Sequence, residues 1–389
     1  MENFEEKACT CALNRIFGFT PVSGLALMEH FGSATGVFRA GRQQLAKIPG
    51  VNPAHIDCIS PAAFKAAGKE LRELEESGVQ FVGMAEKGYP PLLKECPDAP
   101  LGLYIRSASP AEDLWKPVMK IAVVGTRDIS PYGKEWCTRT VSALASADKK
   151  PMIVSGLALG TDICAHRTAL ESGLPTVAVM ATGPLTIYPY RHKAFAEKLC
   201  QTPGCALVTD YPPGTPPLAM HFLRRNRIIA GMSDATILIE SKIKGGGLMT
   251  SRLAFSYSRD VYALPGRADD IRSQGCNRLI WDKVAEPLIS TEKIMENMGL
   301  KGNGRRNKAS VNETLRRHFG GRVTEETISS MTAFIEAVRS ERGITVEEVA
   351  TRLGADYSRA SYLAGMLETE GLICTDLLQR CFIGMDIFG

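Results

Sequence analysis

Short runs of consecutive apolar residues recur through the middle of the chain, and each is followed by a segment with helical spacing. The runs are MKIAVVG (119–125), PMIVSG (151–156), TVAVMATG (176–183), CALVTDY (205–211), ATILIE (235–240) and VYALPG (261–266). Continuous apolar strands separated by helical crossovers are typical of a mainly parallel sheet covered on both faces. The pattern therefore predicts a doubly wound, Rossmann-like α/β domain over residues 79–298.

The amino-terminal part follows a different pattern. Residues 1–78 predict short helices separated by Gly and Pro, because their apolar residues recur at helical spacing. The stretch Ile48-Pro49-Gly50-Val51 resembles the hairpin of helix-hairpin-helix and SAM-like domains. Its other interpretation is a tight turn between two packed helices. We expect an all-α domain of the SAM-like or helix-hairpin-helix type.

The carboxyl-terminal part predicts a further domain. Residues 313–389 contain a helix, a turn at Gly354, a second helix and a β-hairpin, and Thr345 with Glu348 forms a capping-box pattern. This order is typical of a winged-helix domain. Residues 299–312 hold Gly, Asn and four cationic residues with few apolar ones, which indicates a flexible basic linker.

Composition limits the class of protein. A chain of 389 residues is long enough for two or three domains. No apolar run approaches the roughly 20 residues of a membrane span, and the amino end lacks a signal-peptide pattern, so we expect a cytoplasmic location. Eleven cysteines without a C-x-x-C pair favour reduced thiols over disulfides or a metal site.

Charge is distributed unevenly along the chain. The net charge is −1 over residues 1–80, +5 over 81–298, +4 over 299–312 and −4 over 313–389. Positive charge thus gathers in the predicted sheet domain and the linker. The acidic winged-helix segment should repel phosphates, which favours a protein-docking role for it over duplex binding.

Most of the predicted strands end in a glycine-bearing loop, and open α/β sheets bind ligands beyond the carboxyl ends of their strands. Glycine-rich turns can offer backbone N–H groups to an anion. The turn residues that we predict to approach a phosphate are Gly125, Gly156, Gly160, Gly245, Gly246, Gly247, Thr250 and Ser251. The polar and cationic candidates are Arg127, Arg191, Lys193, Arg224, Arg225, Asn226 and Arg227.

Two readings of these side chains remain open. Tyr188 and Tyr190 alternate with cations after the third strand, which suits base stacking combined with phosphate pairing. Alternatively, the tyrosines cap the core and the arginines of the 224–227 cluster pair with Asp210 or Glu240 to hold loops together.

The motifs of common nucleotide-binding and catalytic sites are missing from the sequence. Neither G-x-G-x-x-G nor G-x-x-x-x-G-K-[ST] follows a predicted strand, so dinucleotide and nucleoside-triphosphate binding are not indicated. Ser155, Asp162 and His166 form a triad only on paper, since the last two lie four residues apart on one predicted helix. Glu240 is the best isolated acid. We expect no catalytic residue, cofactor or metal.

Five ordered motifs together resemble the DNA-processing protein A family (DprA, also called Smf). They are IVSGLALGTDICAH, YPPGTPP, RRNRIIAGMSDA, GGGLMTSRLA and RDVYALPG followed by SQGCNRLI, with KGYPPLLKECPDAPLGLYIRS ahead of the predicted sheet. The resemblance covers about residues 80–290. Members often carry lysine in the S-G-L-A-K-G loop, where this chain has Leu159, so one cation of the expected DNA pocket is missing.

The resemblance implies a non-enzymatic mediator of recombination. Such a protein binds single-stranded DNA, dimerises through its α/β domain and loads the recombinase RecA during natural transformation, with single-strand-binding protein as a further partner. Two alternatives are a nucleoside-monophosphate hydrolase of the lysine-decarboxylase-like class and a winged-helix regulator of transcription. The hydrolase class uses a P-G-G-x-G-T-x-x-E loop, which this chain lacks. A role in transcription is disfavoured because the winged-helix segment is acidic and should repel duplex DNA.

Overall fold

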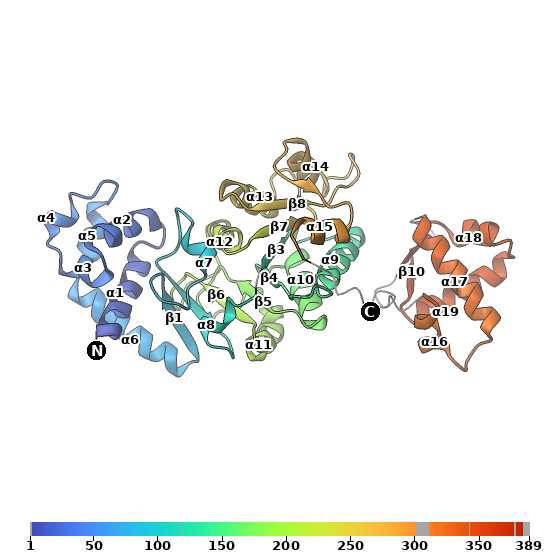
Figure 1. Ribbon diagram of the computed structural model, residues 1–389, viewed down its shortest axis with the longest axis horizontal. Coiled ribbons are helices and arrows are strands. Elements are labelled where there is room, and N and C mark those ends of the chain that lie inside the picture. Colours follow the sequence, from blue (N-terminus) through green and yellow to red (C-terminus); the bar gives the residue numbers. More distant parts are fainter. Residues whose placement is uncertain (1, 118, 301–310, 342, 377–378, 384–389) are drawn as a thin grey trace. The chain divides into compact units, whose positions relative to one another are not determined.

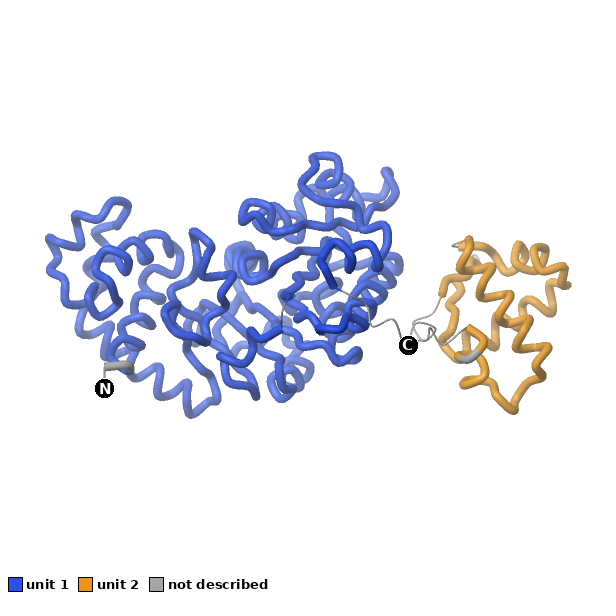
Figure 2. The backbone as a smooth tube through the Cα atoms, in the orientation of Figure 1, with its two compact units in different colours: residues 1–302 blue, residues 303–389 orange. Residues whose placement is uncertain are grey.

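The chain forms two compact units, Met1–Gly302 and Asn303–Gly389, which are described separately (Figure 2). The computed structural model describes residues 2–117, 119–300, 311–341, 343–376 and 379–383. Most of the predicted basic linker, residues 301–310, lies outside the described residues. No described helix has the length and apolar character needed to cross a membrane.

A nine-stranded sheet organises the first unit (Figure 1). Its strand order is β1-β2-β6-β5-β4-β3-β7-β8-β9, and pairing is parallel from β6 through to β9. Its strands are β1 (Val79–Gly83), β2 (Gly102–Arg106), β3 (Lys120–Val124), β4 (Met152–Ser155), β5 (Thr176–Val179), β6 (Ala206–Thr209), β7 (Ala235–Leu238), β8 (Asp260–Ala263) and β9 (Glu286–Pro287). The mainly parallel α/β sheet and all six predicted strands are confirmed.

The sequence did not reveal the strands β1 and β2. The segment that contains Gly102–Arg106 was placed ahead of the sheet, whereas β2 pairs antiparallel with both β1 and β6 and so extends the sheet. The chain adds β4, β5 and β6 on one side of β3 and then β7, β8 and β9 on the other side. The direction of winding therefore reverses between β3 and β7.

Helices cover both faces of the sheet because alternate strand residues point to opposite sides. In β3, Ala122 and Val124 belong to one buried apolar cluster, and Ile121 and Val123 belong to the other. The helices of this region are α7 (Pro91–Lys94), α8 (Ala111–Leu114), α9 (Pro131–Leu144), α10 (Thr161–Glu171), η1 (Tyr190–His192), α11 (Lys193–Gln201), α12 (Ala219–Gly231), α13 (Gly246–Ser256), α14 (Gln274–Trp281) and α15 (Thr291–Asn297).

Six described helices precede the sheet. They are α1 (Glu2–Ile16), α2 (Pro21–Phe31), α3 (Ala34–Arg39), α4 (Arg42–Leu45), α5 (Pro53–Cys58) and α6 (Pro61–Glu76). Ala8 of α1 and Leu74 of α6 pack with Phe81 and Tyr104 of the first two strands. The predicted helices are present and α1 is an addition, but the SAM-like or helix-hairpin-helix class stays a prediction.

The second unit contains the predicted order of elements around its own core. Thr345 and Glu348 form the predicted capping box, and Gly354 ends the following helix in the left-handed region at φ 62°. Its elements are α16 (Val311–Phe319), α17 (Glu325–Ser340), α18 (Val346–Leu353), α19 (Tyr357–Thr369), β10 (Ile373–Thr375) and β11 (Cys381–Ile383). Its assignment as a winged-helix domain stays a prediction.

Candidate nucleic-acid interface

The loops that follow the parallel strands meet at the carboxyl edge of the sheet. The reversal of winding between β3 and β7 makes this edge the usual place for a ligand in an open α/β sheet. The residues predicted to bind DNA lie on the loops after β3, β4, β5 and β7, in the middle of α12 and in the first turns of α13.

A largely exposed group of aromatic and cationic side chains lies on these loops and on the first turns of α11 and α12. The guanidinium of Arg127 lies 4.9 Å from the centre of the Phe222 ring, and Tyr188 packs edge-on against the same ring at 5.5 Å. Lys193 stands 5.7 Å from the ring centre of Tyr190, which is 77% exposed. We call these five residues the strand-tip cluster. Phe222 was not predicted as a site residue, because in the sequence it resembles a residue of the apolar face of α12.

Two arginines of the 224–227 cluster share one buried carboxylate. Arg224 and Arg227 each donate from Nη2 to Oδ2 of Asp210, at 2.5 and 2.7 Å. The side chains are 13%, 7% and 1% exposed for Arg224, Arg227 and Asp210 respectively. Arg224 also stacks between Phe19 and Tyr211 at 4.7 and 4.8 Å. The bracing alternative is thus what the structure shows for these two arginines, and their contact with DNA stays a prediction.

Arg225 is buried inside the carboxyl edge of the sheet. It donates to the carbonyl oxygens of Gly156 and Val179 and, at 3.3 Å, to the side-chain oxygen of Asn226. Burial lowers the pKa of Arg225 to about 10, and the nearby Asp162 carboxylate partly offsets this effect. Arg225 therefore holds the loops after β4 and β5 together, and its predicted contact with DNA stays untested.

The predicted glycine turns are closely packed. A Cβ at Gly156 would meet the Arg225 guanidinium at 2.6 Å, and one at Gly125 would meet the Thr161 hydroxyl at 2.4 Å. Gly160 has φ +73° and lies against the backbone of Thr126 and Arg127. Gly245 and Gly247 are equally confined, whereas Gly246 has only the Asn226 amide at 3.9 Å. Most of these glycines therefore permit close packing of the loops.

The loop after β4 already wraps an anion of the chain itself. The backbone N–H of Ala158 donates to the Asp162 carboxylate at 3.3 Å. Burial raises the pKa of Asp162, and the charge of Arg225 and hydrogen bonds from the loop oppose that rise. Leu157 has φ 58°, an uncommon conformation for a branched residue, and its carbonyl bonds His192 Nδ1 at 2.9 Å. Leu159, at the position of the frequent family lysine, is partly exposed.

The loop after β7 contributes cations that the sequence analysis did not select. Lys242 and Lys244 are exposed ahead of α13. By contrast, Thr250 and Ser251 are buried, and their hydroxyls donate to the carbonyls of Gly246 and Gly247, both at 3.1 Å. The lysines could have been found from SKIKGGG, because cations flank its glycine run. Arg191 is also exposed, on η1.

The residues considered for catalysis have structural partners. Ser155 donates to the Val123 carbonyl at 2.6 Å, and His166 Nδ1 lies 2.7 Å from the Thr176 hydroxyl. Ser155, Asp162 and His166 therefore do not form a catalytic triad. Glu240 accepts from the backbone N–H and the hydroxyl of Ser130 at 2.9 and 2.5 Å, immediately before α9. Within the described parts of the chain, no group of three or more His, Cys, Asp or Glu could hold a metal ion.

Comparison with known proteins identifies the family of the chain. The family described as DNA recombination-mediator protein A matches residues 80–299. Protein Smf of Synechocystis sp. is 30% identical over 76% of this chain and 73% of its own length.

Two solved structures are also similar. DNA processing protein A from Streptococcus pneumoniae has a TM-score of 0.61 and 30% identity over 76% of this chain and 98% of that chain. The Helicobacter pylori protein of the same name, described for its single-stranded DNA binding mode, has a TM-score of 0.50 and 26% identity over 56% of this chain and 95% of that chain. The chain therefore belongs to the DNA recombination-mediator protein A (DprA/Smf) family and acts in DNA processing.

Proposed function

We propose that the protein binds single-stranded DNA at the strand-tip cluster and loads RecA onto that strand. The observation that carries the proposal is the position of the Arg127 guanidinium over the Phe222 ring, with Tyr188 against the ring's edge. Aromatic faces can stack on bases only where the bases are unpaired, and cations beside them can pair with phosphates. Together these groups suit a single strand.

The electrostatic state of Arg127 supports this proposal. Its neighbour Asp128 is engaged by Arg272, whose Nη2 donates to the Asp128 carboxylate at 2.6 Å. Among the residues that the structure describes, Arg127 has no carboxylate within ion-pair distance. Its charge is therefore available to a phosphate, unlike that of Arg224 and Arg227. Lys242 and Lys244 extend the positive charge along the edge toward β7, next to β3.

Fluorescence anisotropy with a labelled oligo-thymidine tests the proposal. Arg127→Ala should weaken binding about tenfold and reduce the slope of log affinity against log salt by about one. Arg39→Ala is the matched control, because Arg39 is exposed and pairs with Glu5 at 3.1 Å in the amino-terminal helices. Equal affinities for Arg127→Ala and the control would refute the assignment, and so would tighter binding to a duplex of the same length.

Recombinase loading is the second part of the proposal and rests on family membership. We expect the protein to speed RecA filament assembly on DNA coated with single-strand-binding protein, in the cytoplasm of a naturally transformable cell. The measurement is RecA ATP hydrolysis on such coated DNA. If the protein binds the strand but leaves the lag before hydrolysis unchanged, the mediator role fails while the DNA site stands.

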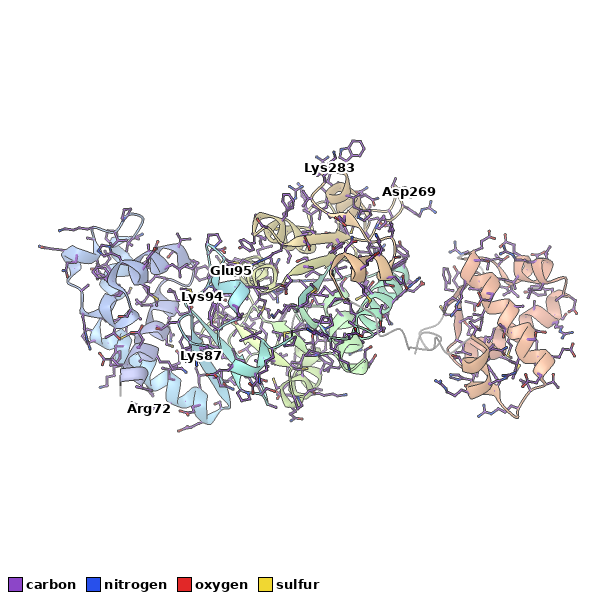
Figure 3. The ribbon with its side chains drawn as sticks, viewed as in Figure 1. Arg72, Lys87, Lys94, Glu95, Asp269 and Lys283 are labelled. Atoms are coloured by element: carbon purple, nitrogen blue, oxygen red, sulfur yellow. The ribbon has the colours of Figure 1, made fainter. Side chains whose placement is uncertain are left out.

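A homodimer through the α/β domain completes the proposal. Three large apolar side chains between residues 271 and 289 are exposed: Ile271 by 58%, Trp281 by 82% and Ile289 by 67%. Lys283 and Asp269 mark this part of the chain, near α14, in Figure 3. Because a second copy would bury these side chains, Trp281→Ala should shift the sedimentation coefficient toward that of a monomer, and Phe255→Ala serves as an exposed aromatic control. A parent protein that sediments as a monomer would contradict the dimer.

A further inference from the structure

Two free cysteines lie between two neighbouring helices close to the turn that carries Arg127, which we call the Arg127 turn. Helices α9 and α10 lie side by side on one face of the sheet (Figure 1). Cys137 Sγ lies 3.9 Å from the carbonyl oxygen of Thr161 on α10, and Cys164 Sγ lies 3.9 Å from the carbonyl oxygen of Lys134 on α9. Each sulfur thus reaches the backbone of the opposite helix, three residues before the other cysteine. The two thiols lie close enough to shift each other's pKa.

The two sulfurs differ in accessibility and acidity. Cys137 is completely buried, whereas Cys164 is partly exposed. Interaction with the Cys137 thiol, together with smaller effects from Thr138 and the Lys134 ammonium, lowers the pKa of Cys164 to about 7. The same interaction, with burial, raises the pKa of Cys137. Because the thiolate is the reactive form of cysteine, the accessible sulfur is the nucleophile and the buried one is placed to resolve it.

We propose that Cys137 and Cys164 form a peroxide-reactive dithiol, which closes to a disulfide and changes the position of the Arg127 turn. The Cys164 thiolate attacks one oxygen of hydrogen peroxide, so that an S–O bond forms, the O–O bond breaks and hydroxide leaves. The Cys137 sulfur then attacks the Cys164 sulfenic acid, forming the S–S bond and breaking the S–O bond. Protons from the two thiols convert the leaving hydroxides to water. Overall, two thiols and one peroxide give one disulfide and two waters.

The connection to the Arg127 turn runs through Thr161 and Gly160. The backbone N–H and the hydroxyl of Thr161 both donate to the Thr126 carbonyl, at 3.1 and 3.2 Å. Gly160 lies so close to the backbone of Arg127 that even a Cβ would overlap it. A covalent bond between Cys137 and Cys164 draws α9 and α10 together at this point. The start of α10 then moves, and the turn that presents Arg127 moves with it.

Disulfide formation can be tested without any DNA. The full chain is reduced, treated with equimolar hydrogen peroxide, alkylated and mapped by peptide mass spectrometry. We expect a Cys137–Cys164 cross-link in the parent and in Cys58→Ser, a control at an exposed cysteine, and none in Cys164→Ser. In Cys137→Ser, dimedone should trap a sulfenic acid on Cys164. Oxidation of Cys58 ahead of Cys164, or failure of the cross-link to form, would overturn the dithiol.

The effect on DNA rests on the proposed function and has a separate readout. The oxidised parent should bind oligo-thymidine about fivefold more weakly than the reduced parent, and dithiothreitol should restore the affinity. Cys164→Ser should bind equally well before and after peroxide. A disulfide that forms without a change in affinity would overturn the coupling but not the dithiol. If even the reduced parent fails to bind the oligonucleotide, the proposed function fails, whatever the mass spectrum shows.

Discussion

Asp210 is the residue whose replacement most directly separates bracing of the fold from DNA binding. Its buried carboxylate is the shared acceptor of Arg224 and Arg227. Asp210→Asn keeps the shape of the side chain but removes the charge, so two guanidiniums lose their ionic partner. Removing one partner of a buried ion pair costs about 3–5 kcal/mol of unfolding free energy. Because Arg224 retains some contact with water, the lower end of that range, about 3 kcal/mol, applies here.

Thermal and urea unfolding measure this cost. For a unit of this size a loss of about 3 kcal/mol lowers Tm by about 6 °C. Asp57→Asn is the matched control, because Asp57 pairs with Arg42 at 2.8 Å on the surface, where such pairs contribute less than about 1 kcal/mol.

The DNA affinity of Asp210→Asn, measured well below its Tm, should stay within about twofold of the parent, since Asp210 and its two arginines are largely buried and none of them belongs to the strand-tip cluster. A Tm equal to that of Asp57→Asn would show that the buried pair does not brace the fold. A folded Asp210→Asn protein whose oligo-thymidine affinity changes by much more than twofold would show that the 224–227 cluster takes part in DNA binding.

Three further predictions concern single positions. Gly160→Ala should lower the unfolding free energy, measured with urea, by more than about 2 kcal/mol, because its Cβ would lie 2.3 Å from the Thr126 carbonyl oxygen. Gly204→Ala is the control, since Gly204 also has positive φ but its Cβ would meet no atom closer than 3.5 Å, and it should cost about 1 kcal/mol. Glu240→Gln should lose about 1–2 kcal/mol through its bonds to Ser130, and it should not alter any hydrolysis of nucleoside monophosphates. Burial lowers the pKa of His166 to about 3, so the unfolded chain gains a proton below pH 6.5 that the folded chain does not. Unfolding free energy should therefore fall by about 2 kcal/mol between pH 6.5 and 5, and His166→Gln should lack that part of the decrease.

The central strands were predictable because they are buried on both faces. Runs such as Ile121–Val124 are apolar throughout, and no other local structure explains them as well. β1 and β2 were harder to predict, since Gln80 interrupts the first, and the second joins the sheet by pairing with β6, about a hundred residues later in the chain. Helix α1 was missed although Phe4, Ala8 and Ala12 follow one another at four-residue spacing. That omission was an error of interpretation, because the signal was present.

The candidate site was predictable in location but not in detail. Glycine and cation content identified the carboxyl edge of the sheet, because phosphate binding needs both. Sequence alone could not distinguish Arg127 from Arg225, since the difference lies in what surrounds each side chain. Arg225 is buried against the carbonyls of two loops, whereas Arg127 is exposed beside the half-buried Phe222 ring, and neither neighbour is close in sequence to the arginine it contacts.

The partners of the arginines indicate which part of the chain is best suited to bind a phosphate. In the second unit, most described arginines pair with a carboxylate; the pairs are Arg316–Glu325, Arg322–Glu370, Arg339–Glu336, Arg352–Glu341, Arg359–Glu326 and Arg380–Asp376. A phosphate that approached one of these would have to compete with the carboxylate. Among the described residues, Arg127 has no such competitor, because an aromatic ring attracts a cation without neutralising its charge. Arg127 is therefore better suited to bind a phosphate than the paired arginines of the second unit. This difference favours DNA binding by residues 79–298 and a protein-docking role for the acidic unit.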